Sequence, residues 1–482
     1  MNQLDGLQPA SVFQYFAEIC AIPHGSRHTK QISDYCVRFA QQHRLRYIQD
    51  ASNNIILFKD GTAGYEQSAP VMLQGHLDMV CEKTADCPID FLTDGLSLRV
   101  QDGMIFAEGT TLGGDDGIAI AYALAILASD DIPHPPLEVV FTVDEEIGML
   151  GAAALDYTPL RARTMLNLDS EDEGFLLVSC AGGVTATCQL PVQRECKTGT
   201  QMTLSISGLT GGHSGVEIDK GRANANKLLG RALYELRKEV SFSLLSVCGG
   251  LKDNAIPRDA TAAFVVAPSD AAIVSQFAQR YQDIFRAEYH VVEPALSVAA
   301  HETASGVYST MTADAQTRTI AALVNLPNGV QHMSADIPGL VQTSLNLGIL
   351  STTEHAVSMH FSVRSSVSTQ KQALVSQLSN LMDVLGGSVL CTGAYPAWEY
   401  NRDSRLRDLM VDIFEKQYGH KPVIQALHAG VECGLFADQL PELDCVSFGP
   451  NILDIHTPKE RMEIASVQRT WRFLLEILRQ LR

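Results

Sequence analysis

His76 and Asp78 follow the apolar run VMLQG and have side chains suited to metal chemistry. Because side chains alternate along a strand, a spacing of two residues places the imidazole and the carboxylate on one face. There the imidazole can bind a metal ion while the carboxylate accepts a hydrogen bond from its second nitrogen and orients the ring. A histidine and an aspartate at this spacing also occur by chance, so a metal site needs further ligands elsewhere in the chain.

Three carboxylates and a second histidine stand at or near the ends of later apolar runs: Asp115, Glu146, Asp169 and His456. Zinc binds mixtures of imidazole and carboxylate, and two ions about 3.5–4 Å apart need a bridging ligand. We predict that Asp115 bridges the two ions. His76 and Asp169 would then complete one half of the site, and Glu146 and His456 would complete the other.

Adjacent Glu145 and Glu146 need different roles, because neighbouring residues on extended backbone point in opposite directions. If Glu146 binds metal, Glu145 faces the attacking water. A carboxylate beside a metal-bound water whose pKa has fallen to about 7 can accept its proton and pass it to a leaving group. We therefore predict Glu145 as general base and acid, and Asp78 as the residue that orients His76.

Each of these residues also has a simpler explanation when taken alone. Asp115 could cap the apolar helix that comes after it, because the helix dipole favours an acid there. The Glu145–Glu146 pair could form a solvated turn, and His456 could be an ordinary surface histidine. Their shared position at the ends of successive apolar runs favours a site, because independent accidents rarely align in this way.

Apolar strands that alternate with helices would position these side chains. The pattern predicts helices over 10–20, 28–44 and 117–129, and strands over 53–59, 71–75, 135–143 and 164–169. This alternation indicates an α/β fold with a mostly parallel sheet covered by helices on both faces. Ligand sites in such sheets lie beyond the carboxyl ends of the strands, where the candidate ligands fall.

The pattern changes after residues 181–183, where half-exposed strands replace buried ones. Residues 184–396 therefore form a predicted inserted α+β domain. The chain then returns to the first domain through a further helix and strand. We expect a discontinuous catalytic, metal-binding domain made of residues 1–183 and 397–482.

The composition limits the classes of function. The chain has 482 residues, 46% of them hydrophobic, and a formal net charge of −19, so its field repels nucleic acid and anionic membranes. Apolar runs stay shorter than the roughly 18 residues of a membrane span, and no basic segment precedes an apolar stretch at the start. We expect a cytoplasmic protein that binds neither nucleic acid nor membranes. Its 11 cysteines lack regular spacing, which argues against a disulfide framework.

Nine motifs are spread along nearly the whole chain: GHLDMVCEK (75–83), EGTTLGGDDGI (108–118), TVDEEIGMLGA (142–152), NLDSEDEG (167–174), GLTGGHSGVEI (208–218), KDNAIPR (252–258), VRSS (363–366), HAGVECG (428–434) and SFGPNILDIHTPKERMEI (447–464). They resemble the zinc-dependent exopeptidases that include carboxypeptidase G and peptidase T, and most closely the aminoacyl-histidine dipeptidase branch. The resemblance implies the metal-ligand and proton-transfer roles given above. It also implies that the inserted domain serves for dimerisation or lid closure, with a homodimer as the expected assembly.

The resemblance assigns further residues. His213 matches a histidine that polarises the scissile carbonyl, and Arg364 matches the arginine that holds the substrate carboxylate in its planar fork. Asn254 is expected to hydrogen-bond the substrate or the tetrahedral intermediate. His428 and Glu432 lie in a Gly-flanked loop that could present a carboxylate to the free α-amino group of a dipeptide.

These expectations predict metal-dependent hydrolysis of dipeptides that have a free N-terminus and a free C-terminal carboxylate. The nucleophile would be a hydroxide bridging two divalent ions, expected to be Zn²⁺, with Co²⁺ or Mn²⁺ as alternatives. Two other functions stay open: an amidohydrolase of N-acyl amino acids with the same metal centre, and a catalytically silent metal- or peptide-binding protein. A deacylase would leave Glu432 unpaired, because its substrates lack a free amine.

Overall fold

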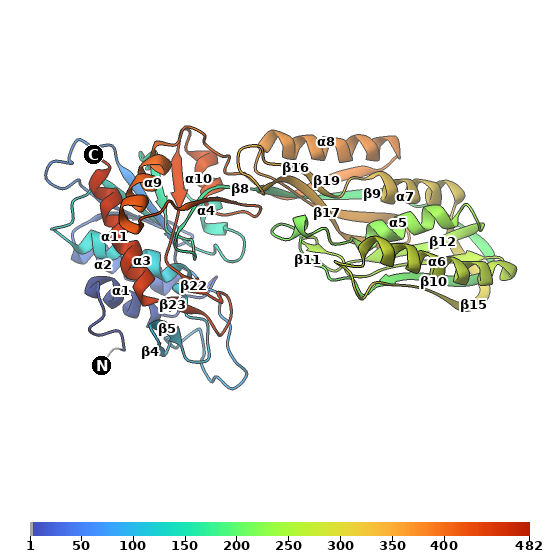
Figure 1. The fold of residues 1–482 in the computed structure, drawn as a ribbon, viewed down its shortest axis with the longest axis horizontal. Coiled ribbons are helices and arrows are strands. Elements are labelled where there is room, and N and C mark those ends of the chain that lie inside the picture. The colour runs from blue at the N-terminus through green and yellow to red at the C-terminus, as the bar shows by residue number, and fades with distance from the viewer. Residues whose placement is uncertain (1–2) are drawn as a thin grey trace. The chain divides into compact units, whose positions relative to one another are not determined.

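The computed structural model describes residues 3–482, which form two compact units. Unit 1 comprises Met1–Ser179, Tyr400–Ala426 and Val431–Arg482, and unit 2 comprises Cys180–Glu399 and Leu427–Gly430. The sequence placed the short segment Leu427–Gly430 in the catalytic domain, whereas in the structure it belongs to unit 2. Figure 1 labels many of the elements of each unit. Within residues 3–482, helices long and apolar enough to cross a bilayer are absent.

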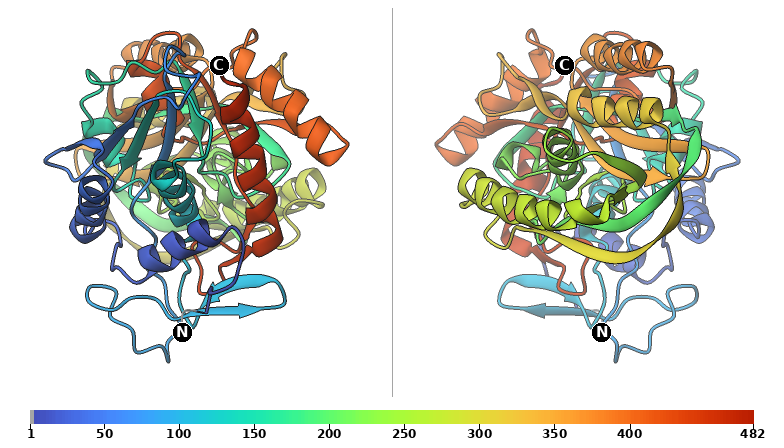
Figure 2. Two further views of the ribbon diagram at one scale, coloured as in Figure 1. Left: turned by 90° about the vertical axis from the view of Figure 1, so that its left-hand side faces the viewer. Right: turned by 90° about the vertical axis from the view of Figure 1, so that its right-hand side faces the viewer.

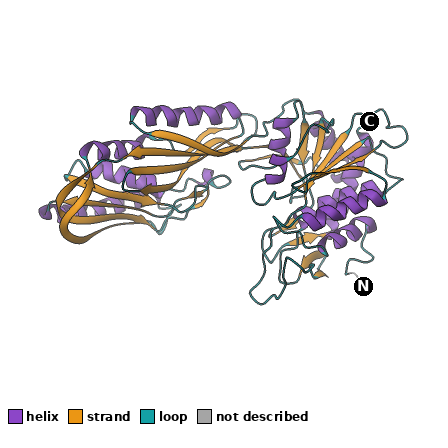
Figure 3. Cartoon of the chain, turned by 180° about the vertical axis from the view of Figure 1, so that it is seen from behind, coloured by secondary structure: helices purple, strands orange, loops and turns teal. Residues whose placement is uncertain are grey.

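Unit 1 is built on an eight-stranded sheet in the order β1-β2-β6-β3-β7-β21-β8-β20. The strands are β1 (Arg46–Gln49), β2 (Ile55–Lys59), β3 (Val71–His76), β6 (Leu137–Thr142), β7 (Thr164–Asn167), β8 (Phe175–Cys180), β20 (Val423–Leu427) and β21 (Asp444–Ser447). The pairs β3–β6, β3–β7 and β7–β21 are parallel, whereas β1–β2, β2–β6 and β8–β21 are antiparallel. The predicted α/β class is confirmed, with the parallel pairs at the centre of the sheet. Every residue of β3 and β6 is buried, and helices flank the sheet on both sides (Figure 3).

The helices of unit 1 are α1 (Ala10–Cys20), α2 (Lys30–Gln42), α3 (Gly114–Ala128), α4 (Leu150–Ala154), α9 (Arg405–Tyr418), α10 (Cys433–Gln439) and α11 (Ile464–Gln480). Because α3 is apolar on all sides, it is buried along almost its whole length, against α1 and β3. Lys59, the last residue of β2, donates from Nζ to the carbonyl oxygens of Ile126 and Leu127 at 3.2 and 3.0 Å. This cation offsets the negative end of the helix dipole and joins β2 to the end of α3.

A small four-stranded sheet, in the order β22-β23-β5-β4, holds the segment that carries His456. Strands β22 (Ile452–Leu453) and β23 (Arg461–Glu463) form a hairpin whose loop contains His456, and β23 also pairs with β5 (Met104–Ala107). Strand β5 pairs with β4 (Leu98–Gln101) and leads into α3. Backbone pairing therefore joins the chain segments that carry Asp115 and His456.

Unit 2 is a nine-stranded antiparallel sheet with helices packed on one face (Figure 2). Its strands are β9 (Gly182–Pro191), β10 (Arg194–Ser207), β12 (Phe242–Gly249), β14 (Ala260–Val266), β15 (Ser297–Met311), β16 (Gly329–Met333), β17 (Val341–Thr352), β18 (Ala356–Ser365) and β19 (Ser388–Tyr395). The helices are α5 (Ala225–Leu236), α6 (Ala271–Tyr289), α7 (Ala313–Asn325) and α8 (Ser368–Val384), with short 3₁₀ turns at η1 (Ile218–Lys220) and η2 (Pro268–Asp270). Burial alternates along β9 and β10 because only one sheet face packs against the helices. The α+β prediction for this part is confirmed.

Candidate metal centre

His76, Asp115 and Asp169 meet beyond the carboxyl ends of the central strands of unit 1. His76 is the last residue of β3, and its Nε2 lies 3.0 Å from Asp115 Oδ1 and 3.5 Å from Asp169 Oδ1. Asp115 stands at the start of α3, and Asp169 comes shortly after β7. All three side chains are buried or nearly so, which keeps their ligand atoms in a fixed, poorly solvated place.

The second oxygen of Asp115 faces a different histidine. Asp115 Oδ2 lies 3.2 Å from His456 Nε2, and the same nitrogen lies 2.9 Å from Glu146 Oε1. One carboxylate thus stands between His76 and His456, and each histidine has a further carboxylate beside it, Asp169 for the first and Glu146 for the second. Two zinc-like divalent cations need a shared carboxylate between them and further imidazole and carboxylate ligands on each side. The residues present therefore fit a dinuclear metal site.

The pKa shifts of these groups show a field that favours positive charge. Hydrogen bonds to Asp115 and Glu146 raise the pKa of His456 to about 10. Burial alone would raise the pKa of Asp115, but hydrogen bonds from His456 and His76 outweigh it and bring that pKa below its ordinary value. The carboxylates that raise the pKa of His456 would also attract a bound cation. The electrostatics of the cluster fit a cation site as well as its geometry does.

Asp78 supports both His76 and the two glutamates that come after β6. Its Oδ1 accepts a hydrogen bond from the backbone N–H of Glu145 at 3.0 Å, and its Oδ2 accepts from that of Glu146 at 3.3 Å and from Ser26 Oγ at 2.8 Å. His76 Nδ1 lies 2.9 Å from the backbone oxygen of Asp78 and 3.6 Å from its carboxylate. The sequence predicted the carboxylate as the partner of the ring, whereas the backbone oxygen is nearer because the carboxylate holds the loop after β6.

Glu145 lies half-buried in that loop, next to the carboxylates of the centre. Burial, with the nearby charges of Asp169, Glu146 and Asp115, raises its pKa to about 8. The backbone bond to Asp78 fixes its position at the end of β6, one residue before a candidate ligand. A carboxylate placed there is suited to accept and return a proton.

Unit 2 brings together a second group, formed by Arg364 on β18 and His428. Arg364 Nη1 donates to the hydroxyl of Tyr395 at 2.8 Å. His428 Nε2 lies 2.7 Å from Ser344 Oγ. Burial, followed by the charge of Arg364, lowers the pKa of His428 to about 4, so this ring is neutral near pH 7. Arg364 Nε and His428 Nδ1 are buried and lack hydrogen-bond partners within residues 3–482, which leaves two nitrogens for an anionic ligand.

His213 and Asn254 lie on paired segments of unit 2. Strand β11 (Gly212–His213) pairs with β13 (Ala255–Ile256), and the N–H of Ser214 donates to the carbonyl of Asn254 at 2.9 Å. Asn346 holds the same turn, because its Nδ2 donates to the carbonyl oxygens on either side of Asn254, those of Asp253 at 3.2 Å and of Ala255 at 2.8 Å. The structure therefore brings these two predicted residues together. It places them in unit 2, whereas the metal-ligand set lies in unit 1.

Glu432 is more deeply buried than a loop residue facing a substrate would be. It is fully buried in unit 1, at the start of α10, and its Oε2 accepts hydrogen bonds from Gln74 Nε2 and Thr142 Oγ1, both at 2.6 Å. Asn167 Nδ2 donates to Gln74 Oε1 in turn. Glu432 therefore bonds directly to β3 and β6, and Gln74 extends this network to β7. The other oxygen of Glu432, Oε1, is buried and lacks a hydrogen-bond partner within residues 3–482, and a role toward the substrate amine stays a prediction.

The comparisons with known proteins agree with this geometry. Residues 72–480 match peptidase family M20/M25/M40. The chain belongs to this family. It is 38% identical to the cytosol non-specific dipeptidase of Escherichia coli (strain K12) over 483 aligned residues, which cover 100% of this chain and 99% of that protein.

Solved structures show the same relationship for this M20 peptidase. The aminoacylhistidine dipeptidase from Vibrio alginolyticus matches with a TM-score of 0.93 and 37% identity, over 98% of this chain and 97% of that one. The aminopeptidase PepT from Bacillus cereus ATCC 10987 shares the fold at 15% identity, with a TM-score of 0.57 and coverage of 98% and 99%. The predicted resemblance is confirmed, and the chain is a hydrolase that acts on peptide bonds.

Sequence reasoning missed three buried or nearly buried acids of the M20 peptidase. Asp116 Oδ2 accepts a hydrogen bond from the backbone N–H of His76 at 3.1 Å. Glu171 offers a ligand atom within 4.8 Å of atoms from Asp115 and Asp169. Glu460 is bonded to the segment just before Asp115. The doublet at 115–116 and the acidic run SEDE were visible signals for the first two acids, whereas nothing in the sequence pairs residue 460 with residues 112–114.

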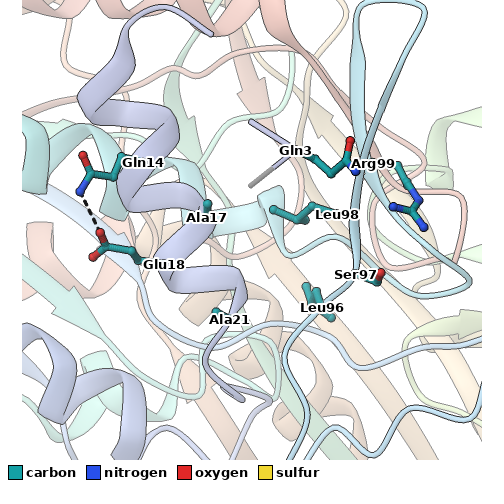
Figure 4. Close-up of a pocket in the computed structure, with 9 residues that line it drawn as sticks. All are labelled: Gln3, Gln14, Ala17, Glu18, Ala21, Leu96, Ser97, Leu98 and Arg99. Carbon is teal, nitrogen blue, oxygen red and sulfur yellow. Dashed lines mark hydrogen bonds between the residues drawn. The ribbon is translucent and has the colours of Figure 1, made fainter. Parts of the chain in front are cut away.

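A hollow of about 560 Å³ lies in unit 1 between α1 and the 96–99 segment (Figure 4). Its two charged side chains already have partners. Glu18 Oε1 accepts from Gln14 Nε2 at 3.0 Å, and Arg99 Nε lies 2.9 Å from Glu108 Oε1. The residues that line this hollow belong to none of the candidate metal-ligand groups within residues 3–482.

Proposed function

We propose that this peptidase hydrolyses dipeptides that have a free N-terminus and a free C-terminal carboxylate, with two divalent metal ions held by unit 1. The observation that carries the proposal is the placement of Asp115, whose two oxygens face His76 and His456. Relatives named as dipeptidases, which align over nearly the full chain, support the substrate class.

The residues of unit 1 divide the work of hydrolysis. Bound metal would polarise the scissile carbonyl and supply a water that loses a proton near neutral pH. His76, Asp115 and Asp169 would hold one ion, with Glu146 and His456 completing the site of the other. Glu145, held by Asp78, would accept the proton of the attacking water and deliver it to the leaving amine.

The residues of unit 2 would bind the substrate. Arg364 offers a buried guanidinium to the C-terminal carboxylate, which favours substrates with a free carboxylate. His428 is neutral near pH 7 and has a buried ring nitrogen without a protein partner, so it would add a hydrogen bond to the same group. His213 would polarise the carbonyl, and Asn254 would hydrogen-bond the tetrahedral intermediate.

We further propose Zn²⁺ as the metal and a cytoplasmic homodimer as the working form. The mixed imidazole and carboxylate ligands support Zn²⁺, with Co²⁺ or Mn²⁺ as alternatives. The name of the Escherichia coli relative supports the cytoplasm. Metal analysis of the purified protein tests the assignment of Zn²⁺. Sedimentation velocity of the full chain tests the homodimer.

The proposal is tested by replacing Glu145 with Gln. Because the amide cannot take the proton, we expect kcat on a dipeptide to fall by about 10²- to 10⁴-fold, with metal content unchanged. Asp144→Asn is the matched control, since it removes the same charge from the neighbouring residue, whose left-handed backbone suits Asn. Full activity in the Glu145→Gln enzyme would refute the base assignment.

A panel of free and N-acetylated dipeptides separates the proposal from a deacylase with the same centre. We expect turnover of the free dipeptides and its loss after chelation. Preferential hydrolysis of the acetylated compounds would favour the deacylase. Binding of metal and peptides without any turnover would instead indicate a catalytically silent binding protein.

A further inference from the structure

Glu460 is a buried acid that holds the segment before Asp115. It lies in the loop of the β22–β23 hairpin, four residues after His456, and only 3% of its surface is exposed. Its Oε2 accepts hydrogen bonds from the backbone N–H groups of Leu112 at 2.9 Å and Gly113 at 3.3 Å, and its Oε1 accepts from that of Gly114 at 2.8 Å. Both carboxylate oxygens are therefore used by the same turn of backbone.

The two glycines of that turn fit this contact. Gly113 has a φ of +63°, a left-handed conformation that glycine adopts without strain. A Cβ at Gly114 would lie 3.3 Å from Glu460 Oε1, closer than side chains usually approach. The Gly-Gly pair thus lets the backbone come close enough to surround the carboxylate with N–H donors.

The bonds of Glu460 join the two halves of the metal centre. The turn at residues 112–114 runs directly into Asp115, and the hairpin that carries Glu460 also carries His456. The other side-chain contacts of the hairpin loop are more open to solvent, because Asp454 is exposed and the side chain of His456 is 44% exposed. Backbone pairing between β5 and β23 fixes the base of the hairpin, whereas Glu460 fixes its loop.

Glu460 is separate from the candidate metal ligands. The groups of side chains within residues 3–482 that could hold a metal draw on His76 and the acids near it, and Glu460 is in none of them. Its oxygens face backbone N–H donors. It therefore acts on the centre through the segments it connects.

We propose that Glu460 is a positioning residue that sets the separation of Asp115 and His456 and thereby the affinity for the metal ion shared by Asp115, Glu146 and His456. This inference rests on the proposed metal centre. Substitutions of residues that orient metal ligands typically weaken metal affinity by about 10- to 100-fold, and we expect a loss of that size at one of the two sites.

The test is a Zn²⁺ titration of the metal-free full-length protein, in competition with a chromophoric chelator. Glu460→Gln keeps the size of the side chain but places an amide N–H against a backbone donor. We expect one Zn²⁺ to bind about 10- to 100-fold more weakly and the other to bind as in the wild type. The melting temperature of the metal-free variant should fall, because buried backbone N–H groups lose an acceptor, and the increase that Zn²⁺ produces should be smaller than in the wild type.

Asp454→Asn is the matched control, because Asp454 lies in the same hairpin loop and pairs with Arg461, away from residues 112–114. Its two Zn²⁺ affinities should equal those of the wild type. The inference would be overturned if the Glu460→Gln protein bound both Zn²⁺ ions as tightly as the wild type. It would also be overturned if the substitution lowered the melting temperature by the same amount with and without Zn²⁺. If Glu460→Gln does not fold, Glu460→Asp, which is one methylene shorter, takes its place with the same expectations. A wild type that binds no Zn²⁺ would instead refute the metal centre itself.

Discussion

At the scale of single residues, the metal centre depends on a carboxylate whose two oxygens do different work. Asp115 and His456 are 341 positions apart in the sequence, yet Asp115 Oδ2 lies 3.2 Å from the imidazole, while Oδ1 faces His76. Replacing Asp115 by Asn leaves one oxygen and turns an NH₂ group toward the other partner. We expect metal content to fall from two ions per chain to one or fewer, with loss of turnover, as measured by elemental analysis after dialysis. Two ions retained in Asp115→Asn would contradict the bridging role.

Tyr395 is a second residue whose substitution should change substrate binding without changing the chemical step. Its hydroxyl accepts a hydrogen bond from Arg364, and removing such a bond to a charged group costs about 1.5–3 kcal/mol. We expect Tyr395→Phe to raise KM for a dipeptide by about 10-fold with little change in kcat, because the arginine fork loses its fixed direction. The same dipeptide with a C-terminal amide is the control. If the KM of the amide rises equally, Tyr395 acts on the fold and not on carboxylate binding.

The sequence predicted which side chains cluster better than it predicted the residues that support them. His76, Asp115, Glu146, Asp169 and His456 could be found because each is a metal-ligating type at or near the end of an apolar run. Glu460 and Glu432 could not be understood in the same way, because their partners are backbone N–H groups and side chains that only folding brings near. Glu432 in particular looks like a loop acid in HAGVECG, although it is buried and bonded to side chains of β3 and β6.

At the scale of elements, α3 depends on the end of a neighbouring strand. Lys59 donates to the last carbonyls of α3, and burial lowers the pKa of its ammonium. We expect Lys59→Met, which keeps the length of the side chain, to lower the free energy of unfolding by about 1–3 kcal/mol, because buried carbonyls lose their donor. Urea unfolding of the metal-free protein measures this change. Lys30→Met, at an exposed pair with Asp34, is the control and should have almost no effect.

The predictions for elements were accurate where apolar patterns were long. The helix at 10–20 and the strands that end near residues 76, 142 and 167 lie where the patterns placed them, to within a few residues. Helix α3 begins at Gly114, three residues before its predicted start, because the Gly-Gly-Asp-Asp segment forms its first turn with non-helical backbone at Asp115 and Asp116. The antiparallel edges of the main sheet could not be predicted, because strand direction depends on connections that periodicity does not show.

At the scale of the whole molecule, the metal ligands and the groups proposed to bind substrate belong to different compact units. A ligand stabilises the part of the protein that binds it, by about 2.7 kcal/mol at a free concentration 100 times its Kd. In differential scanning calorimetry, we therefore expect chelation to lower the transition of unit 1 and leave that of unit 2 in place. Equal shifts of both transitions on metal removal would contradict the assignment of all five ligands to unit 1.

The tetrapeptide Leu427–Gly430 determines how chimaeras of this fold must be cut. It is separated from the rest of unit 2 by a stretch of unit 1, yet the N–H of Ala181 donates to the carbonyl of Leu427 at 3.0 Å. Gly430 lies so close to the ring of Tyr395 that an added Cβ would come within 2.6 Å of it. If only residues 180–399 were exchanged with those of a relative, each of these contacts would join a native residue to a foreign one. A transplant of unit 2 therefore has to carry two pieces of sequence, the long insertion and these four residues.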